Sequence, residues 1–213
     1  MRRAAVLLLA GLAAFLLIGW AAGELWTSAI GSSEAALMRE VAAQRSQAAT
    51  DLARIVTWAG SAFVLVPLAL LSCALLLRSG LRTQAAAVAL SLGGAMLISD
   101  AVKGLVARPR PAVEHLQSVG GFSFPSGHAT QASAFWLSLV FAAASAGAPA
   151  TLTRLMAAAA ALIIVLVGLS RIYLGVHYPS DVVAGILLGG GWAAYVAVCV
   201  GSLAPRSPRR EGS

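Results

Sequence analysis

The chain has 213 residues, of which 59% are hydrophobic and 11% charged, and its formal net charge is +7. Soluble domains carry about 25% charged residues, so this composition, with a mean hydropathy of +0.85, excludes an ordinary soluble protein and predicts an integral membrane protein. The positive charge does not indicate nucleic-acid binding, because the surplus arginines flank apolar segments and no nucleic-acid-binding motif is present.

Six apolar segments approach the length of about 20 residues that a helix needs to cross a bilayer. They are residues 4–22, 55–77, 84–106, 128–148, 152–170 and 182–203. The sequence therefore predicts an all-α fold, a six-transmembrane-helix bundle, as one membrane-embedded domain over 1–213 with its core at about 55–203. The first segment has a second interpretation as a cleaved signal peptide, because Arg2 and Arg3 precede its apolar run.

The distribution of arginines predicts the orientation, since cytoplasmic loops of membrane proteins carry an excess of Lys and Arg. With a cytoplasmic N-terminus, the inner segments collect Arg2, Arg3, Arg78, Arg82, Arg154, Arg206, Arg209 and Arg210. We therefore expect a multi-pass protein of the cell (inner) membrane. Both termini, including a tail at 204–213, would lie in the cytoplasm, and the polar clusters described below would face the periplasm or the outside.

The segment 23–54 is expected at the outer face as an amphipathic stretch. Ser33 is a plausible N-cap and Glu34 suits a first helical turn, which predicts a helix from Ser33 to Arg54. Such a helix would lie in the membrane interface, and the alternative is a solvated loop.

The first polar cluster contains the only lysine of the chain. Lys103 begins a K-x6-RP pattern that ends with Arg110 and Pro111. A lone cation in an apolar chain usually has a function, and a lysine beside a planar guanidinium suits the binding of one anion. The alternative is a lysine that reaches the interface from a helix end, paired with Asp100.

The second cluster, Pro125-Ser126-Gly127-His128, opens the segment 128–148. Ser126 is the expected N-cap, and Gly127 allows a close approach to the backbone. The free N–H groups and positive dipole of a helix start favour an anion. The alternative is an ordinary capped helix start with an incidental His128.

The third cluster has the pattern SR-x5-H-x3-D, with Arg171, His177 and Asp181. A carboxylate on one ring nitrogen fixes the tautomer of an imidazole and leaves the other nitrogen free to attack. The alternative is a salt-linked helix cap. The predicted topology brings all three clusters to one membrane face, so we expect an active site there.

Together, the three patterns resemble those of the type 2 phosphatidic acid phosphatase superfamily, over roughly residues 55–200 and with no departure at a signature position. The resemblance implies a bacterial integral-membrane lipid phosphatase that needs no cofactor and no metal. Its partner would be a lipid phosphate in the membrane, such as undecaprenyl diphosphate, phosphatidylglycerophosphate, phosphatidic acid or lipid A phosphate.

The resemblance also implies residue roles. His177 would be the nucleophile that forms a phosphohistidine, Asp181 would orient it, and His128 would protonate the leaving oxygen and then activate water. The phosphate-binding residues would be Lys103, Arg110, Ser126, Gly127 and Arg171.

Several alternatives stay open from the sequence. A lipid phosphotransferase would use the same site. A non-catalytic lipid-phosphate binding or transport protein is the other alternative, although charge in transporters usually lies near the midplane of the membrane and here it clusters at one end. The lipid, the preference for mono- or diphosphate and the oligomeric state are not determined. Arg108 either touches substrate or headgroups or lies in the interface; His115 has no assigned role; Glu114, Phe122 and Phe124 could shape the substrate entrance.

Overall fold

The computed structural model describes residues 2–201, and within them it contains seven α-helices, one short 3-10 helix and no strand. The elements are α1 (Arg2–Ala43), α2 (Gln47–Val56), η1 (Thr57–Gly60), α3 (Ala62–Arg78), α4 (Arg82–Val106), α5 (Gly127–Ser145), α6 (Ala150–Tyr173) and α7 (Pro179–Gly201). The predicted all-α class is confirmed. The expected tail at 204–213 and the end of the segment 182–203 lie outside the described residues, as do the side chains of Arg2 and Arg3.

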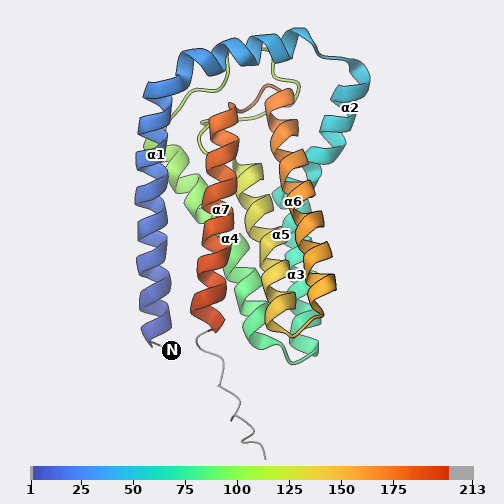
Figure 1. Cartoon of the computed structure of the whole chain (residues 1–213). Helices are drawn as coiled ribbons and strands as arrows, with labels where there is room; N and C mark the ends of the chain where they lie inside the picture. Colours follow the sequence, from blue (N-terminus) through green and yellow to red (C-terminus); the bar gives the residue numbers. More distant parts are fainter. Residues whose placement is uncertain (1, 202–213) are drawn as a thin grey trace, which may run out of the picture.

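The helices α3 to α7 run alongside one another as a bundle (Figure 1), and the first half of α1 packs against α4 and α7. The second half of α1 then crosses one end of this bundle, and α2 leads back toward α3. We call the crossed end the polar end, because the connections 107–126 and 174–178 lie there. The opposite end holds the start of α1, the turns at 79–81 and 146–149, and the last described residues of α7.

The separate amphipathic helix expected from Ser33 to Arg54 is wrong. α1 continues through Ser33 to Ala43, and α2 begins after a break at 44–46. The N-cap is Ser46, whose side chain accepts a hydrogen bond from the backbone N–H of Ala49 at 3.4 Å. Gly31 and Ser32, just before Ser33, are poor helix formers, but Glu34 and Met38 in the next turns are buried, so packing keeps the helix continuous through Ser33.

Four of the described helices are long and apolar enough to cross a membrane, namely α1, α4, α6 and α7. The bent pair α2–η1 and α3 makes a fifth if it is taken as one broken span. α5 does not meet this criterion, since polar side chains such as His128 and Gln131 lie near its start. Length and composition therefore support four or five of the six predicted spans, in a multi-pass membrane protein.

α5 is the central helix of the bundle and packs against α4, α6 and α7. α7 approaches it closely through Gly189, where an added Cβ would collide with the carbonyl oxygen of Thr130 and the hydroxyl of Ser133. Small residues allow such close helix contacts in membranes. At the polar end, the N–H of Ser126 donates to the carbonyl oxygen of Asp181 at 2.9 Å. The close packing of α5 and α7 thus aligns the second and third polar clusters.

The connection 107–126 is tied to the connection between α6 and α7. The N–H of Leu116 donates to the carbonyl oxygen of Leu174 at 3.0 Å. Gly175 turns the chain after α6 with a φ of +78°, and an added Cβ there would lie 2.7 Å from the carbonyl oxygen of Glu114. Because only glycine adopts this backbone conformation readily, Gly175 holds the two connections together over the polar end.

Candidate active site

The structure brings all the predicted site residues to the polar end of the bundle. Each comes from the end of a helix or from a connection next to it. They are Lys103 at the end of α4, Arg110 in the following loop, Ser126, Gly127 and His128 at the start of α5, Arg171 at the end of α6, His177 before α7 and Asp181 in the first turn of α7. The three clusters therefore lie together at one end of the bundle, and the membrane face that this end occupies stays a prediction.

His177 is buried, with its two ring nitrogens facing groups of opposite charge. Its Nδ1 lies 3.5 Å from Oδ2 of Asp181, and its Nε2 lies 3.4 Å from Nη1 of Arg110. The same Oδ2 of Asp181 accepts a hydrogen bond from the N–H of Tyr178 at 2.8 Å. Asp181 is thus fixed by the backbone, and it favours the tautomer of His177 with a proton on Nδ1 and a lone pair on Nε2.

Arg110 is held by backbone carbonyl groups of two connections. Its Nη1 donates to the carbonyl oxygen of Val176 at 2.8 Å, and its Nη2 donates to that of Gly120 at 2.7 Å. A third bond runs from Nε to the carbonyl oxygen of Gly121 at 3.1 Å. Because these acceptors are neutral, the charge of Arg110 remains available to an anion beside His177.

Arg171 and Lys103 add two further cations. Nη1 of Arg171 donates to Oγ1 of Thr57 at 2.8 Å and to Oε1 of Gln117 at 2.6 Å, and the side chain is 1% exposed. Nζ of Lys103 donates to the carbonyl oxygens of Pro125 and Phe122. None of these acceptors carries a charge, so the cations stay unneutralised by direct partners.

The start of α5 faces these cations. Ser126 is the N-cap, as predicted, but its hydroxyl makes no hydrogen bond to the helix. An added Cβ on Gly127 would lie 3.8 Å from Cε of Lys103, so the glycine leaves the backbone open toward the lysine. His128 in the first turn interacts electrostatically with Lys103, Arg110, Arg171 and His177.

Several buried polar atoms of the site have no hydrogen-bond partner. They include Oγ of Ser126, Nε of Arg171 and Nδ1 of His177. Buried polar groups in folded proteins are almost always satisfied, and the first two are donors beside cations and a helix start. The set fits a tetrahedral oxyanion such as a phosphoryl group.

The pKa values of the loop residues follow from burial and charge. Burial lowers the pKa of His177 to about 4, against the opposing effect of the Asp181 carboxylate, so the imidazole is neutral at pH 7. Burial also lowers the pKa of Arg110 from its ordinary value. Both pKa shifts arise because the groups are held out of water. The same exclusion of water strengthens electrostatic interactions within the site.

Sequence reasoning missed four residues that support the site. Arg108, whose role was open, lies in the interior at 3% exposure and donates to Asp181 and to Glu34. Thr57 and Gln117 hold Arg171. Glu34 completes the set, and its only sequence signal is a third cation, Arg108, between Lys103 and Arg110, since a buried cation is most favourable with a carboxylate partner.

Three loop residues are placed differently from one another. Phe124 is fully buried and packs against Trp26 with ring centroids 6.5 Å apart, so its expected place at a substrate entrance is wrong. Phe122 is 41% exposed. His115 contacts the carbonyl oxygen of Pro111 through Nε2 at 2.9 Å.

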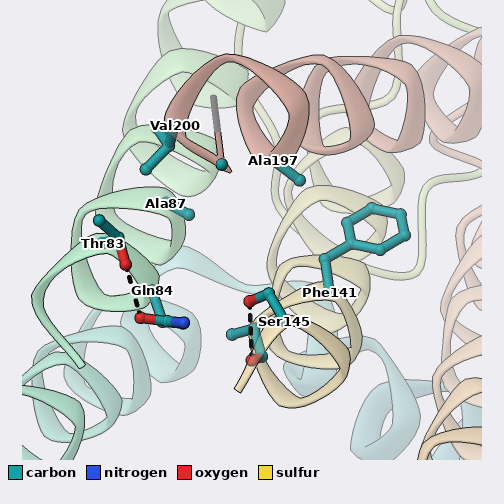
Figure 2. Close-up of a pocket in the computed structure, with 9 residues that line it drawn as sticks. Thr83, Gln84, Ala87, Phe141, Ser145, Ala197 and Val200 are labelled. Atoms are coloured by element: carbon teal, nitrogen blue, oxygen red, sulfur yellow. Dashed lines mark hydrogen bonds between the residues drawn. The ribbon is translucent and has the colours of Figure 1, made fainter. Parts of the chain in front are cut away.

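The arrangement can bind a phosphoryl group and offer a neutral imidazole to it. Among residues 2–201, no three His, Cys, Asp or Glu side chains lie together so that they could hold a metal ion. A cavity of about 210 Å³ at the opposite end, between α4, α5 and α7 (Figure 2), contains none of the predicted site residues. Among the described residues, the predicted cations and imidazoles therefore lie at the polar end and not around this cavity.

Curated relatives of this chain are bacterial and archaeal phosphatases. Phosphatidylglycerophosphatase B of Bacillus subtilis (strain 168) is 28% identical over 169 residues, which cover 79% of this chain and 83% of that protein. Lipid A 1-phosphatase of Rhizobium etli is 32% identical, covering 48% of this chain and 44% of that protein. Decaprenylphosphoryl-5-phosphoribose phosphatase of Mycobacterium tuberculosis is 39% identical, covering 46% and 51%.

Two solved structures resemble the fold. The crystal structure of a transmembrane PAP2 type phosphatidylglycerolphosphate phosphatase from Bacillus subtilis matches with a TM-score of 0.75 and 26% identity, over 94% of this chain and 98% of that one. The crystal structure of Aquifex aeolicus LpxE matches with a TM-score of 0.61 and 25% identity, over 75% and 92%. These matches confirm the expectation of an enzyme, a lipid phosphatase. The family model of the PAP2 superfamily matches residues 84–204, and the chain belongs to this superfamily.

Proposed function

We propose that this chain hydrolyses a lipid phosphate or diphosphate at the polar end of the bundle, without a metal ion, through a phosphohistidine on His177. One observation carries the proposal. Lys103, Arg110 and Arg171 converge on a buried imidazole whose Nδ1 faces Asp181, and these cations have only neutral hydrogen-bond acceptors. Such a cluster is suited to binding a phosphoryl group and attacking it.

In the first step, Nε2 of His177 attacks phosphorus. The N–P bond forms while the bond from phosphorus to the lipid oxygen breaks, and His128 donates a proton to that leaving oxygen. Asp181 stabilises the positive charge that develops on the ring of His177. The three cations and the start of α5 stabilise the charge on the phosphoryl oxygens in the transition state.

In the second step, His128 accepts a proton from water, and the water oxygen attacks phosphorus. The N–P bond breaks and its electron pair returns to His177, so that inorganic phosphate leaves and the imidazole is neutral again. Ser126 and Gly127 bind phosphoryl oxygens through the hydroxyl and the backbone N–H in both steps.

We choose phosphatidylglycerophosphate as the first substrate to test. The Bacillus subtilis phosphatidylglycerophosphatase matches this chain over most of both proteins, whereas the other named relatives match over about half of this chain. Undecaprenyl diphosphate, phosphatidic acid and a lipid A 1-phosphate complete the panel, since they share the phosphoryl group and differ in the lipid.

The orientation is also part of the proposal: six spans, both termini in the cytoplasm and the polar end outward. The exposed arginines at the opposite end, Arg78, Arg82 and Arg154, support it. α5 would cross the bilayer within the other helices. In a variant with both native cysteines replaced by alanine, Ser118→Cys should react with an impermeant maleimide on intact cells and Ser79→Cys only after permeabilisation. The reverse pattern would invert the topology.

Phosphate release by the purified protein in detergent, with a chelator present, tests the function. We expect release from at least one lipid of the panel, loss of it in His177→Ala, and retention in His115→Ala, which removes a loop histidine outside the site. An acid-labile phosphoenzyme should form in the wild type and be absent from His177→Ala. Equal release by the wild type and His177→Ala would overturn the proposal.

A further inference from the structure

Glu34 is a buried carboxylate that lies outside all three polar clusters and outside the region matched by the family model. It lies in the second half of α1, the half that crosses the polar end (Figure 1), and the residue is 6% exposed. A buried carboxylate is unfavourable unless it is paired and hydrogen-bonded. Its partners therefore indicate what it does.

One set of partners belongs to the start of α7. Oε1 of Glu34 accepts a hydrogen bond from the N–H of Ser180 at 2.7 Å, and Oε2 accepts one from the hydroxyl of Ser180 at 2.7 Å. The first N–H groups of a helix have no partner within it, and negative charge there is favourable. Glu34 thus caps the helix whose first turn carries Asp181.

The other partner is Arg108. Its Nη2 donates to Oε2 of Glu34 at 2.8 Å, and its Nη1 donates to Oδ1 of Asp181 at 2.7 Å. The guanidinium also stacks on the ring of Tyr178 at 4.1 Å. Burial by itself would lower the pKa of Arg108, but the hydrogen bond to Glu34 and the nearby carboxylates raise it above its ordinary value. Arg108 is thus a permanent cation shared by two carboxylates.

Asp181 connects this pair to His177, because its second oxygen, Oδ2, lies 3.5 Å from Nδ1 of the imidazole. A continuous series of contacts therefore runs from Glu34 through Arg108 and Asp181 to His177. If the charge of Glu34 were lost, the positive charge of Arg108 would be balanced by Asp181 alone. Asp181 would then stabilise positive charge on the imidazole less well.

The charges facing His177 from the other elements do not substitute for Glu34. Lys103 comes from α4, Arg110 from the loop and Arg171 from α6, and all three are cations. His128 from α5 also interacts with His177. Asp181 is the one anion in direct contact with the imidazole among the described residues, so its charge balance decides how readily His177 becomes positive.

We infer that Glu34 is a positioning residue of this enzyme, which holds the first turn of α7 and balances Arg108 so that Asp181 keeps its full charge for His177. The inference rests on the proposed function, in that His177 is taken as the nucleophile. It gives the N-terminal helix a part in a site whose three sequence patterns lie entirely downstream of it.

The test compares Glu34→Gln with Glu40→Gln, which changes an exposed carboxylate on the same helix. We expect kcat of E34Q to fall roughly tenfold, with KM within about twofold of the wild type. The reason is that E34Q weakens the stabilisation of the positive charge that develops on His177 during attack. The ¹⁵N resonances of His177, assigned by their loss in His177→Gln, should show protonation at lower pH in E34Q than in the wild type. E40Q should match the wild type in both measurements.

The double variant E34Q/R108Q removes the charges of Glu34 and Arg108 together, so no unbalanced guanidinium remains beside Asp181, and it serves as a second test if E34Q does not fold. We expect its His177 to be protonated at a pH no lower than in the wild type, because the unbalanced guanidinium is gone. Normal kcat in E34Q, or a lower kcat with unchanged titration of His177, would overturn the inference. A wild type without phosphatase activity would instead defeat the proposed function, while the titrations would still decide the role of Glu34.

Discussion

The two ends of the bundle use charge in opposite ways. In the candidate site at the polar end, charged side chains are held out of water, with Arg171 at 1% and Asp181 at 0% exposure. At the opposite end, Arg78, Arg82 and Arg154 are all exposed. A buried ion costs several kcal/mol unless it is well partnered, whereas an exposed arginine at a membrane surface costs little. The buried charges therefore support the proposed chemistry, and the exposed arginines support the proposed orientation.

The ends also differ in how well their polar groups are satisfied. In the cavity at the opposite end (Figure 2), the hydroxyl of Thr83 donates to Oε1 of Gln84 at 2.8 Å, and that of Ser145 donates to a carbonyl oxygen of its own helix at 3.1 Å. At the polar end, Oγ of Ser126 and Nε of Arg171 have no partner. Unsatisfied donors next to buried cations, rather than open volume, therefore separate the candidate site from this cavity.

Asp181→Asn should have the largest effect on activity. The amide keeps the size of the side chain but lacks the charge that favours Nδ1–H on His177, and kcat should fall roughly a thousandfold. Phosphate release in detergent measures it. Arg154→Gln at the opposite end is the control and should leave kcat unchanged. Comparable losses in the two variants would remove the distinction between the ends.

The stability of the polar end should depend on pH through His177. Burial lowers the pKa of His177 to about 4 from an ordinary value of 6.5. Between these values the folded protein binds fewer protons than the unfolded one, so the free energy of unfolding falls as the pH is lowered, by up to roughly 3 kcal/mol. Tm measured in detergent across this range should therefore decline less steeply in His177→Gln than in the wild type. Parallel curves for the two proteins would contradict the prediction.

The packing that aligns the clusters should be sensitive at Gly189. An added Cβ would collide with the carbonyl oxygen of Thr130 in α5, so Gly189→Ala should destabilise the protein by about 1–3 kcal/mol. Gly93→Ala is the matched control, because nothing lies within 4 Å of its added Cβ. Tm should fall in the first variant and stay level or rise in the second. A Tm for Gly189→Ala equal to that of the wild type would show that α5 and α7 can separate without cost.

The three polar patterns could be predicted because each is local in sequence, and helix ends place local patterns together. Lys103, His128 and His177 therefore reach the site that the sequence predicted. The bounds of α4, α6 and α7 are also close to those of the predicted segments, because a continuous apolar run of that length rarely forms anything but a membrane-spanning helix. The sequence did not predict which side chains and backbone groups contact each of these site residues.

The N-terminal part was predicted less well, because its contribution depends on contacts over long sequence separations. Glu34 reads locally as the first turn of a helix after Ser33, and its partners at Arg108 and Ser180 lie 74 and 146 residues away. Thr57 meets Arg171 across 114 residues. A single sequence gives no signal for such pairs except the general need of a buried charge for a partner.

Thr57→Val should lower kcat only slightly, but the loss should be specific to a change at the polar end of the bundle. The valine keeps the shape of the side chain but loses the hydroxyl that accepts from Arg171, leaving Gln117 as the other acceptor of Nη1. A net hydrogen bond is worth about 1 kcal/mol, so kcat should fall about fivefold. Thr57→Ser, which retains the hydroxyl, should stay within about twofold of the wild type.

Gln84→Leu makes the equivalent change at the opposite end, where it removes the hydrogen-bond acceptor of Thr83 in the cavity. The chain loses one side-chain hydrogen bond in each variant, so a general loosening of the bundle would lower kcat in both. We expect kcat of Gln84→Leu to equal that of the wild type, because none of the predicted site residues lines that cavity. A fivefold loss in both would mean that Thr57 acts through the stability of the fold, whereas a loss in Thr57→Val alone places the effect on Arg171.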